Sequence, residues 1–171
     1  FEEAFNTVLK RFAFIADRAA WLKKHEGVPT RSIMLGGLAS FELDRPRWSE
    51  DTFDAPQEFR ALDQVAFRNP SNDAWMTITL HEAQGTLTAE LQEATTSYTS
   101  RVKDAKLQPI NLAGRRGKWL GMEIRGTDQL LVPPNQDRVY LVAVTNNDGI
   151  AAWVVLEAIR GRQDELRDEW E

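Results

Sequence analysis

One hairpin constrains the fold more than any other feature of this sequence. Segments 138–145 and 150–157 are nearly continuous in apolar residues, and they flank the turn sequence Asn146-Asn147-Asp148-Gly149. Asp-Gly favours a tight hairpin turn because glycine readily takes the positive φ that such a turn requires. Short strands that are apolar on both sides are buried on both faces of a sheet. The sequence therefore predicts an antiparallel sheet with this hairpin at its centre.

Further segments predict the rest of an α+β domain, in which helices flank the antiparallel sheet. Shorter strands bounded by turn residues are expected over 38–44, 63–68, 75–82, 110–113 and 118–125. Apolar residues at i, i+4 and i+7 predict a helix over 87–105, capped by Thr86 or Thr88. The charged tail over 161–171 predicts a short terminal helix.

The first 27 residues predict one long amphipathic helix, a unit separate from the domain over 38–171. Its seam comprises Phe1, Phe5, Val8, Phe12, Ile15, Ala19 and Leu22, and Gly27-Val28-Pro29 ends the pattern. Phe14 and Trp21 fall one heptad apart on the opposite side of this helix. Two aligned aromatic side chains predict a second contact surface, for self-association, a protein partner or a membrane. The alternative is that segment 27–37 folds back over them.

Composition excludes several classes of function. A net charge of −5 and a pI near 5.2 argue against nucleic-acid binding, which needs a basic surface to neutralise phosphates. The absence of cysteine excludes thiolate chemistry and disulfides within this sequence. The sequence contains no run of 18 or more apolar residues, so it predicts no membrane-spanning helix. The chain starts at Phe1, already inside a helical pattern, so we expect an upstream segment that carried any signal or membrane anchor.

Motifs for catalysis, cofactors or metals are absent from the sequence. His25 and His81 are the only histidines, and His81-Glu82-Ala83-Gln84 lacks the second histidine of the zinc motif HExxH. His81 is instead expected on the polar face of a strand, and His25 near a helix C-terminus. No GxSxG motif places a serine nucleophile. We therefore predict no catalytic residues, no cofactor and no metal.

A basic hairpin is the one candidate recognition site in the domain. Arg115 and Arg116 form its tip, and Lys118 and Trp119 follow directly. Arginine and tryptophan are common anchors at protein interfaces, so these residues could contact an acidic partner or lipid headgroups. A solvated hairpin tip without a partner is the alternative. A phosphate-binding loop is excluded because Leu112 and Trp119 replace the glycine and the Ser/Thr that it needs.

The order of these elements resembles the PsbP-like fold family, which includes the extrinsic photosystem II subunit and many small bacterial lipoproteins. The residues that carry the resemblance are Phe41-Glu42-Leu43, Pro46-Arg47-Trp48, Val65-Ala66-Phe67-Arg68-Asn69-Pro70, the Gly-Arg-Arg-Gly hairpin before Trp119 and the central hairpin over 138–157. The resemblance covers about 38–171 and leaves out the leading helix. It implies an α-β-α sandwich with a binding or assembly role, and it transfers no site residue.

These observations together predict a non-enzymatic protein-interaction or assembly module. We expect it to be tethered to a membrane through the upstream segment, on the extracytoplasmic side, with a cytoplasmic location left open. One alternative is a small-molecule or lipid carrier, whose pocket would lie between the sheet and the 87–105 helix. A second alternative is an uncharacterised hydrolase.

Overall fold

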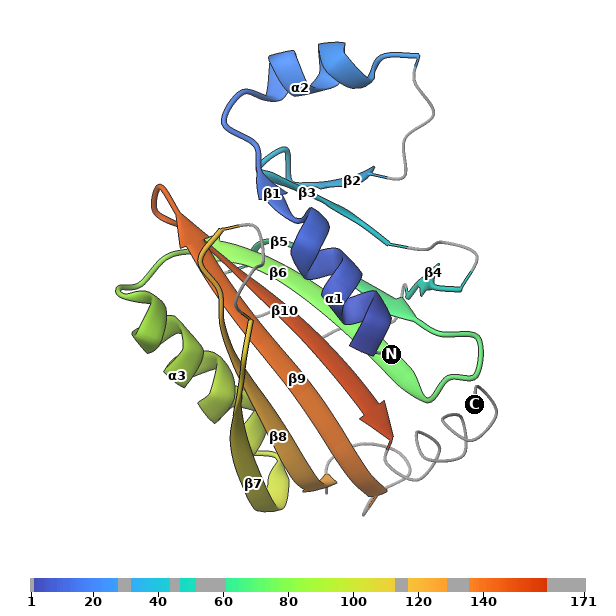
Figure 1. Cartoon of the computed structure of the whole chain (residues 1–171), viewed down its shortest axis with the longest axis vertical. Helices are drawn as coiled ribbons and strands as arrows, with labels where there is room; N and C mark the ends of the chain where they lie inside the picture. Colours follow the sequence, from blue (N-terminus) through green and yellow to red (C-terminus); the bar gives the residue numbers. More distant parts are fainter. Residues whose placement is uncertain are drawn as a thin grey trace.

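The structure is a computed structural model that describes residues 2–27, 32–43, 47–51, 61–112, 117–128 and 136–159. Its helices are α1 (Glu2–Arg11), α2 (Arg18–His25) and α3 (Leu87–Thr99). Its strands are β1 (Ala13–Phe14), β2 (Ser32–Leu35), β3 (Ala39–Glu42), β4 (Ser49–Glu50), β5 (Ala61–Arg68), β6 (Ala74–Glu82), β7 (Val102–Ile110), β8 (Leu120–Asp128), β9 (Gln136–Asn147) and β10 (Ile150–Ile159). Figure 1 shows their arrangement around one large sheet.

The large sheet is antiparallel and has the predicted hairpin at its centre. Its order is β4-β5-β6-β10-β9-β8-β7, so β10 is the middle strand of seven. Val154 of β10 lies opposite Ala143 on β9 and Ile78 on β6. The turn between β9 and β10 has positive φ at Asp148 (48°) and Gly149 (78°), as an Asp-Gly hairpin requires. The α+β fold predicted from this hairpin is confirmed.

Helices pack on both faces of the large sheet, which makes three layers. Alternate residues of β10 point to opposite faces, and each set belongs to a different buried cluster. Val154 and Leu156 belong to the larger cluster, together with residues of α1 and of the small sheet β1-β3-β2. Trp153 and Val155 belong to the smaller cluster beneath α3. The expected sandwich is therefore present, with α1 on one face and α3 on the other (Figure 1).

The N-terminal amphipathic helix is confirmed over Glu2–Arg11, but the prediction that it continues to residue 27 is wrong. Ala13 and Phe14 form strand β1, whose partners on β3 are Ser40 and Ala39. A new helix, α2, then begins after Asp17. The apolar spacing of the segment suits a helix, but pairing with β3 supplies backbone hydrogen bonds to a β-favouring Phe-Ala-Phe sequence. Tertiary pairing therefore overrides the local pattern.

The predicted helix over 87–105 is also too long. α3 ends at Thr99, and Val102 starts strand β7, where it lies opposite Asp128 of β8. The last turns of α3 are rich in serine and threonine, whose hydroxyls bond to nearby carbonyls and favour helix ends. Val102 continues the helical spacing by coincidence and is buried as the first residue of the strand. The strand expected over 110–113 accordingly starts earlier, at Val102.

Two predicted features lie outside the described residues. One is the terminal helix expected over 161–171, and the other is the tip of the basic hairpin over 113–116. The strands on either side of that hairpin, β7 and β8, are described and are paired with each other.

Candidate functional site

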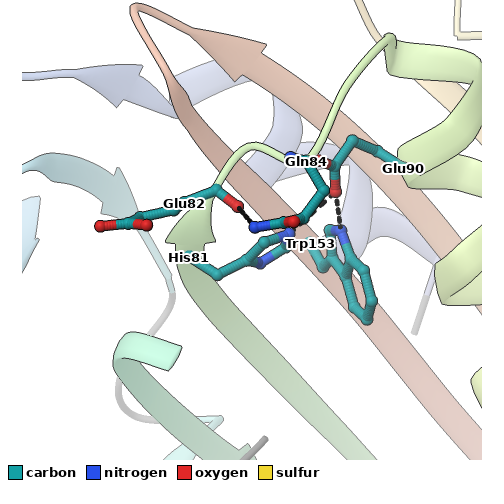
Figure 2. Close-up of polar contacts among 5 residues, drawn as sticks. All are labelled: His81, Glu82, Gln84, Glu90 and Trp153. Atoms are coloured by element: carbon teal, nitrogen blue, oxygen red, sulfur yellow. Dashed lines mark hydrogen bonds and ion pairs between the residues drawn. The ribbon is translucent and has the colours of Figure 1, made fainter. Parts of the chain in front are cut away.

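The candidate site is a cluster of hydrogen-bonded polar groups around Glu90, in the first turns of α3. Thr86 caps this helix by accepting a hydrogen bond from the Ala89 backbone N–H at 3.2 Å, and this places Glu90 above β6 and β10. The Glu90 Oε2 atom accepts from His81 Nε2 at 2.8 Å and from Trp153 Nε1 at 3.1 Å. Its Oε1 atom accepts from the Gln84 backbone N–H at 2.7 Å. Figure 2 shows these groups converging on one carboxylate.

Hydrogen bonds keep the Glu90 carboxylate ionised despite its burial. Burial alone would raise the pKa of Glu90, but the hydrogen bonds from Gln84, His81 and Trp153 outweigh it, so the pKa lies below its ordinary 4.5. An ionised Glu90 implies that His81 donates from Nε2. The other ring nitrogen, Nδ1, is buried and has no hydrogen-bond partner within the described residues. The imidazole of His81 is thus hydrogen-bonded to Glu90 at Nε2 and has no partner among the described residues at Nδ1.

The chemistry open to His81 and Glu90 depends on whether their side chains are accessible to solvent. His81 is 4% exposed and Glu90 is 1% exposed, so neither side chain reaches solvent. The Trp153 ring packs edge-on against the imidazole, with 4.7 Å between ring centroids. Within the described part of the chain, no group of three or more His, Cys, Asp or Glu side chains could hold a metal ion. The arrangement links α3 to β6 and β10. His81 lies on a strand, as expected, but on a buried face rather than an exposed polar one.

A second polar cluster lies on the same face of the sheet, at the opposite end of β10. The Arg138 guanidinium donates to the Glu157 carboxylate and lies 5.5 Å from the centre of the Trp75 ring. The Tyr140 hydroxyl donates to Asp128. Burial raises the pKa values of both the Tyr140 hydroxyl and the Glu157 carboxyl. Arg138 is 2% exposed, so this cluster is also internal and joins neighbouring strands.

Two of the four residues proposed for the basic hairpin lie in the described part of the chain, and one of these two is exposed. Arg115 and Arg116 lie outside the described residues, and Lys118 is exposed. Trp119 is only 7% exposed, and its ring packs edge-on against Phe12 with 5.5 Å between centroids. A large aromatic side chain gains more from this core contact than from solvent, which corrects its expected place at the hairpin surface.

The expected stripe of Phe14 and Trp21 does not exist, because the two residues lie on different elements. Phe14 is in β1, half-buried against the larger core, with its ring edge-on to Phe12 at 5.3 Å. Trp21 is in α2, half-buried, and stacks on the ring of His25 at 4.0 Å. Their common heptad position assumed one continuous helix. Only Trp21 therefore remains on the outer N-terminal element.

Helix α2 is the most exposed element of the N-terminal region. None of its side chains is buried, and Leu22 is 47% exposed. Figure 1 shows α2 at one end of the molecule, beyond the small sheet and away from the large one. The Arg18 side chain lies against Gly37 in the turn between β2 and β3. Among the described helices, none is long and apolar enough to cross a membrane.

Sequence reasoning missed the Glu90 cluster because its parts are distant in the chain. His81 and Trp153 lie 9 and 63 residues from Glu90. A capping box would place a glutamate three residues after the Thr86 cap, at the position that Ala89 occupies. Glu90 is one position later and bonds to the Gln84 backbone instead of the cap residue. The offset glutamate after a threonine cap was the one local signal.

Comparisons with known proteins gave a likeness among solved structures. No protein-family model and no curated protein matches the chain. Among solved structures, it is similar to the solution structure of cyanobacterial PsbP (CyanoP) from Synechocystis sp. PCC 6803. The sequence identity is 20% and the TM-score 0.44, over 83% of this chain and 89% of that one.

Proposed function

We propose that this chain is a non-enzymatic interaction module that binds a protein partner through its N-terminal arm. The arm comprises α2, β1 and the β2–β3 hairpin, residues 13–27 and 32–42. The observation that carries the proposal is α2, which has no buried side chain and exposes Leu22. The extracytoplasmic, membrane-associated location that the sequence resemblance implies belongs to the same proposal.

Local interactions stabilise helix α2 when no partner is bound. Helices shorter than about 12–15 residues are marginal in water unless packing supports them, and α2 has eight residues. Asp17 caps its start by accepting from the Ala20 backbone N–H at 3.0 Å. The last turn of α2 holds the basic residues Lys23, Lys24 and His25, and positive charge there interacts favourably with the negative end of the helix dipole. A bound partner would add the apolar burial that this helix lacks, which suits a docking element.

The interior of the domain gives less support to the two alternatives. A hydrolase would need its acid–base groups within reach of a substrate, whereas His81 and Glu90 are buried. A carrier would keep space for a ligand beneath α3. Buried side chains occupy that space, among them Tyr140, Val142 and Trp153. Both polar clusters are better explained as interactions that stabilise the fold by joining neighbouring elements.

Site-specific photocrosslinking in the host cell tests the proposal. A photoreactive phenylalanine analogue at position 22 should give a discrete adduct with one protein. The same analogue at position 107 is the matched control, because Leu107 is 51% exposed but lies on edge strand β7. Equal labelling at both positions, or none at position 22, would show that the arm is not a specific contact.

A further inference from the structure

The turn of the central hairpin joins an aspartate directly to a glycine at an exposed position. Asp148-Gly149 is the one place in the sequence where an aspartate or asparagine precedes a glycine. Both residues are exposed, and φ is positive at each, 48° at Asp148 and 78° at Gly149. A Cβ atom built on Gly149 would meet no atom within 4 Å beyond its chain neighbours. In the described part of the chain, nothing therefore crowds the peptide bond between the two residues.

We infer that Asp148 is a site of spontaneous covalent modification, at which the aspartate converts to isoaspartate. The backbone nitrogen of Gly149 can close a five-membered ring with the side-chain carboxyl of Asp148. After any other residue type the Cβ atom of that residue hinders the attacking nitrogen, whereas glycine has no Cβ atom and leaves the backbone free to rotate. The inference concerns the chemistry of the hairpin and does not depend on the proposed function.

The reaction needs water as its only co-reactant. The Gly149 nitrogen attacks Cγ of Asp148 and forms a C–N bond, and the carboxyl hydroxyl leaves with the amide proton as water. Water then hydrolyses the cyclic imide. Attack at Cγ restores aspartate, whereas attack at the backbone carbonyl carbon leaves the chain running through Cγ and frees the α-carboxyl group. The product is isoaspartate, and the mass of the chain is unchanged.

The position of Asp148 at the tip of the hairpin permits the backbone rotation that ring closure requires. The two-residue turn is closed by the pair of Asn147 and Ile150. Its link to the rest of the molecule is a hydrogen bond from the Ala83 backbone N–H to the Gly149 carbonyl oxygen at 2.8 Å. Exposed turns open locally at a lower free energy than the paired strands of a core do. The Asp148 carboxylate accepts from Asn147 Nδ2 at 3.4 Å, a long and exposed contact that does not fix its position.

Asp104 is a matched comparison within the same chain. It is also exposed and also has a positive φ, 55°, at the bulge of β7. The residue that follows it is alanine, which carries the hindering Cβ atom. The two aspartates therefore share exposure and backbone region and differ in the residue that follows. Asp148 should react, and Asp104 should stay largely unmodified.

Isoaspartate at position 148 would disturb the large sheet at its centre. It adds one atom to the backbone of the turn that joins β9 to β10. The Asn147–Ile150 pair and the bond from Ala83 to Gly149 both depend on the length of that turn. The modified chain should therefore unfold at a lower temperature than the unmodified chain.

Ageing of the intact purified chain tests the inference. After several weeks in neutral buffer at physiological temperature, the chain is treated with protein isoaspartate methyltransferase and labelled S-adenosylmethionine, which methylates the freed α-carboxyl group. Mass spectrometry then locates the label. The peptide that contains Asp148 should carry at least about ten times the label of the peptide that contains Asp104, because only Asp148 precedes glycine. Asp148→Asn keeps a residue type that tolerates positive φ, and it should form the same imide faster by releasing ammonia.

The other outcomes contradict the inference at different steps. Equal label at Asp104 and Asp148 would overturn the role given to Gly149. No label at Asp148, or an Asp148→Asn chain that keeps its amide, would show that the folded turn does not permit ring closure and would overturn the modification site. Chromatography separates the modified chain from the unmodified one, and equal midpoints of thermal unfolding would overturn the predicted effect on the sheet.

Discussion

Helices α2 and α3 are stabilised in opposite ways. α3 packs on the sheet through a buried cluster, and Glu90 adds three hydrogen bonds that join it to β6, β10 and the preceding loop. α2 has no buried side chain and depends on its cap, its dipole and a stacked ring pair. The comparison teaches that polar residues mark different roles in the two helices. In α3 the polar side chain of Glu90 is internal and holds the structure, whereas none of the polar side chains of α2 is buried.

Removing Glu90 should have the largest effect, because it breaks the polar tie of α3. Glu90→Ala leaves the buried His81 Nε2 and Trp153 Nε1 atoms, and the part-buried Gln84 N–H, without their acceptor. Breaking a buried charged network by removing one partner costs about 3–5 kcal/mol. Urea unfolding followed by circular dichroism should show this fall in the free energy of unfolding. Glu90→Gln keeps an acceptor of similar size and should lose less. Equal losses in both variants would show that the ionised carboxylate contributes nothing special.

Acid should remove the advantage that Glu90 gives. Its pKa in the folded chain lies below its ordinary value of 4.5, so the unfolded chain takes up a proton more readily. The stabilisation is therefore complete above about pH 4.5 and is lost as the pH falls through the folded-state pKa. The difference in unfolding free energy between the wild type and Glu90→Gln should shrink accordingly from pH 6 to pH 3. A constant difference over that range would contradict the ionised state of Glu90.

Phe14 and Trp21 should differ sharply in how much they contribute to the free energy of unfolding. Phe14→Ser removes an apolar ring from the edge of the larger core and should cost about 1–3 kcal/mol. Trp21→Ser removes only the stacking partner of His25 and should cost about 0.5 kcal/mol or less. Parallel thermal and urea unfolding of the two variants compares them directly. Similar losses would mean that α2 is integrated into the fold as firmly as β1.

The parts of the fold that sequence reasoning predicted are those whose signal is local. The Asp148-Gly149 sequence by itself indicates a turn with positive φ. The apolar residues of the two strands beside it by themselves indicate burial. The predicted ends of the two long helices are wrong because the contacts that set these ends are not local. The helical spacing runs past Phe14, through Phe12 and Ile15, and it includes Val102. Only the pairing of Phe14 with Ala39 and of Val102 with Asp128, 25 and 26 residues away, makes these segments strands. Nothing local in either segment reports that partner.

The internal site was harder to predict than the fold, and the contact surface predicted for Phe14 and Trp21 assumed one continuous helix that does not form. His81, Glu90 and Trp153 meet only after β6, α3 and β10 have packed. Their separation in the chain hides the cluster from any motif. The sequence places Trp21 opposite an apolar seam of one helix, yet β1 interrupts that helix. Its place on an outer helix follows from the break at residues 12–17 and from the lack of packing along α2.

The smallest expected effect on stability is also the sharpest test of the arm. Leu22→Ser changes a side chain that is already 47% exposed, so it should move the unfolding free energy by no more than about 0.5 kcal/mol. Amide hydrogen exchange should show rapid exchange along α2 in the free protein and slow exchange in α3, because only α3 is held by buried contacts. Binding of a partner to the arm should slow exchange at residues 21–25 in the wild type, and Leu22→Ser should weaken that protection while leaving α3 unchanged. Slow exchange along α2 without a partner would show that this helix is already packed, and the contrast between the two helices would then fail.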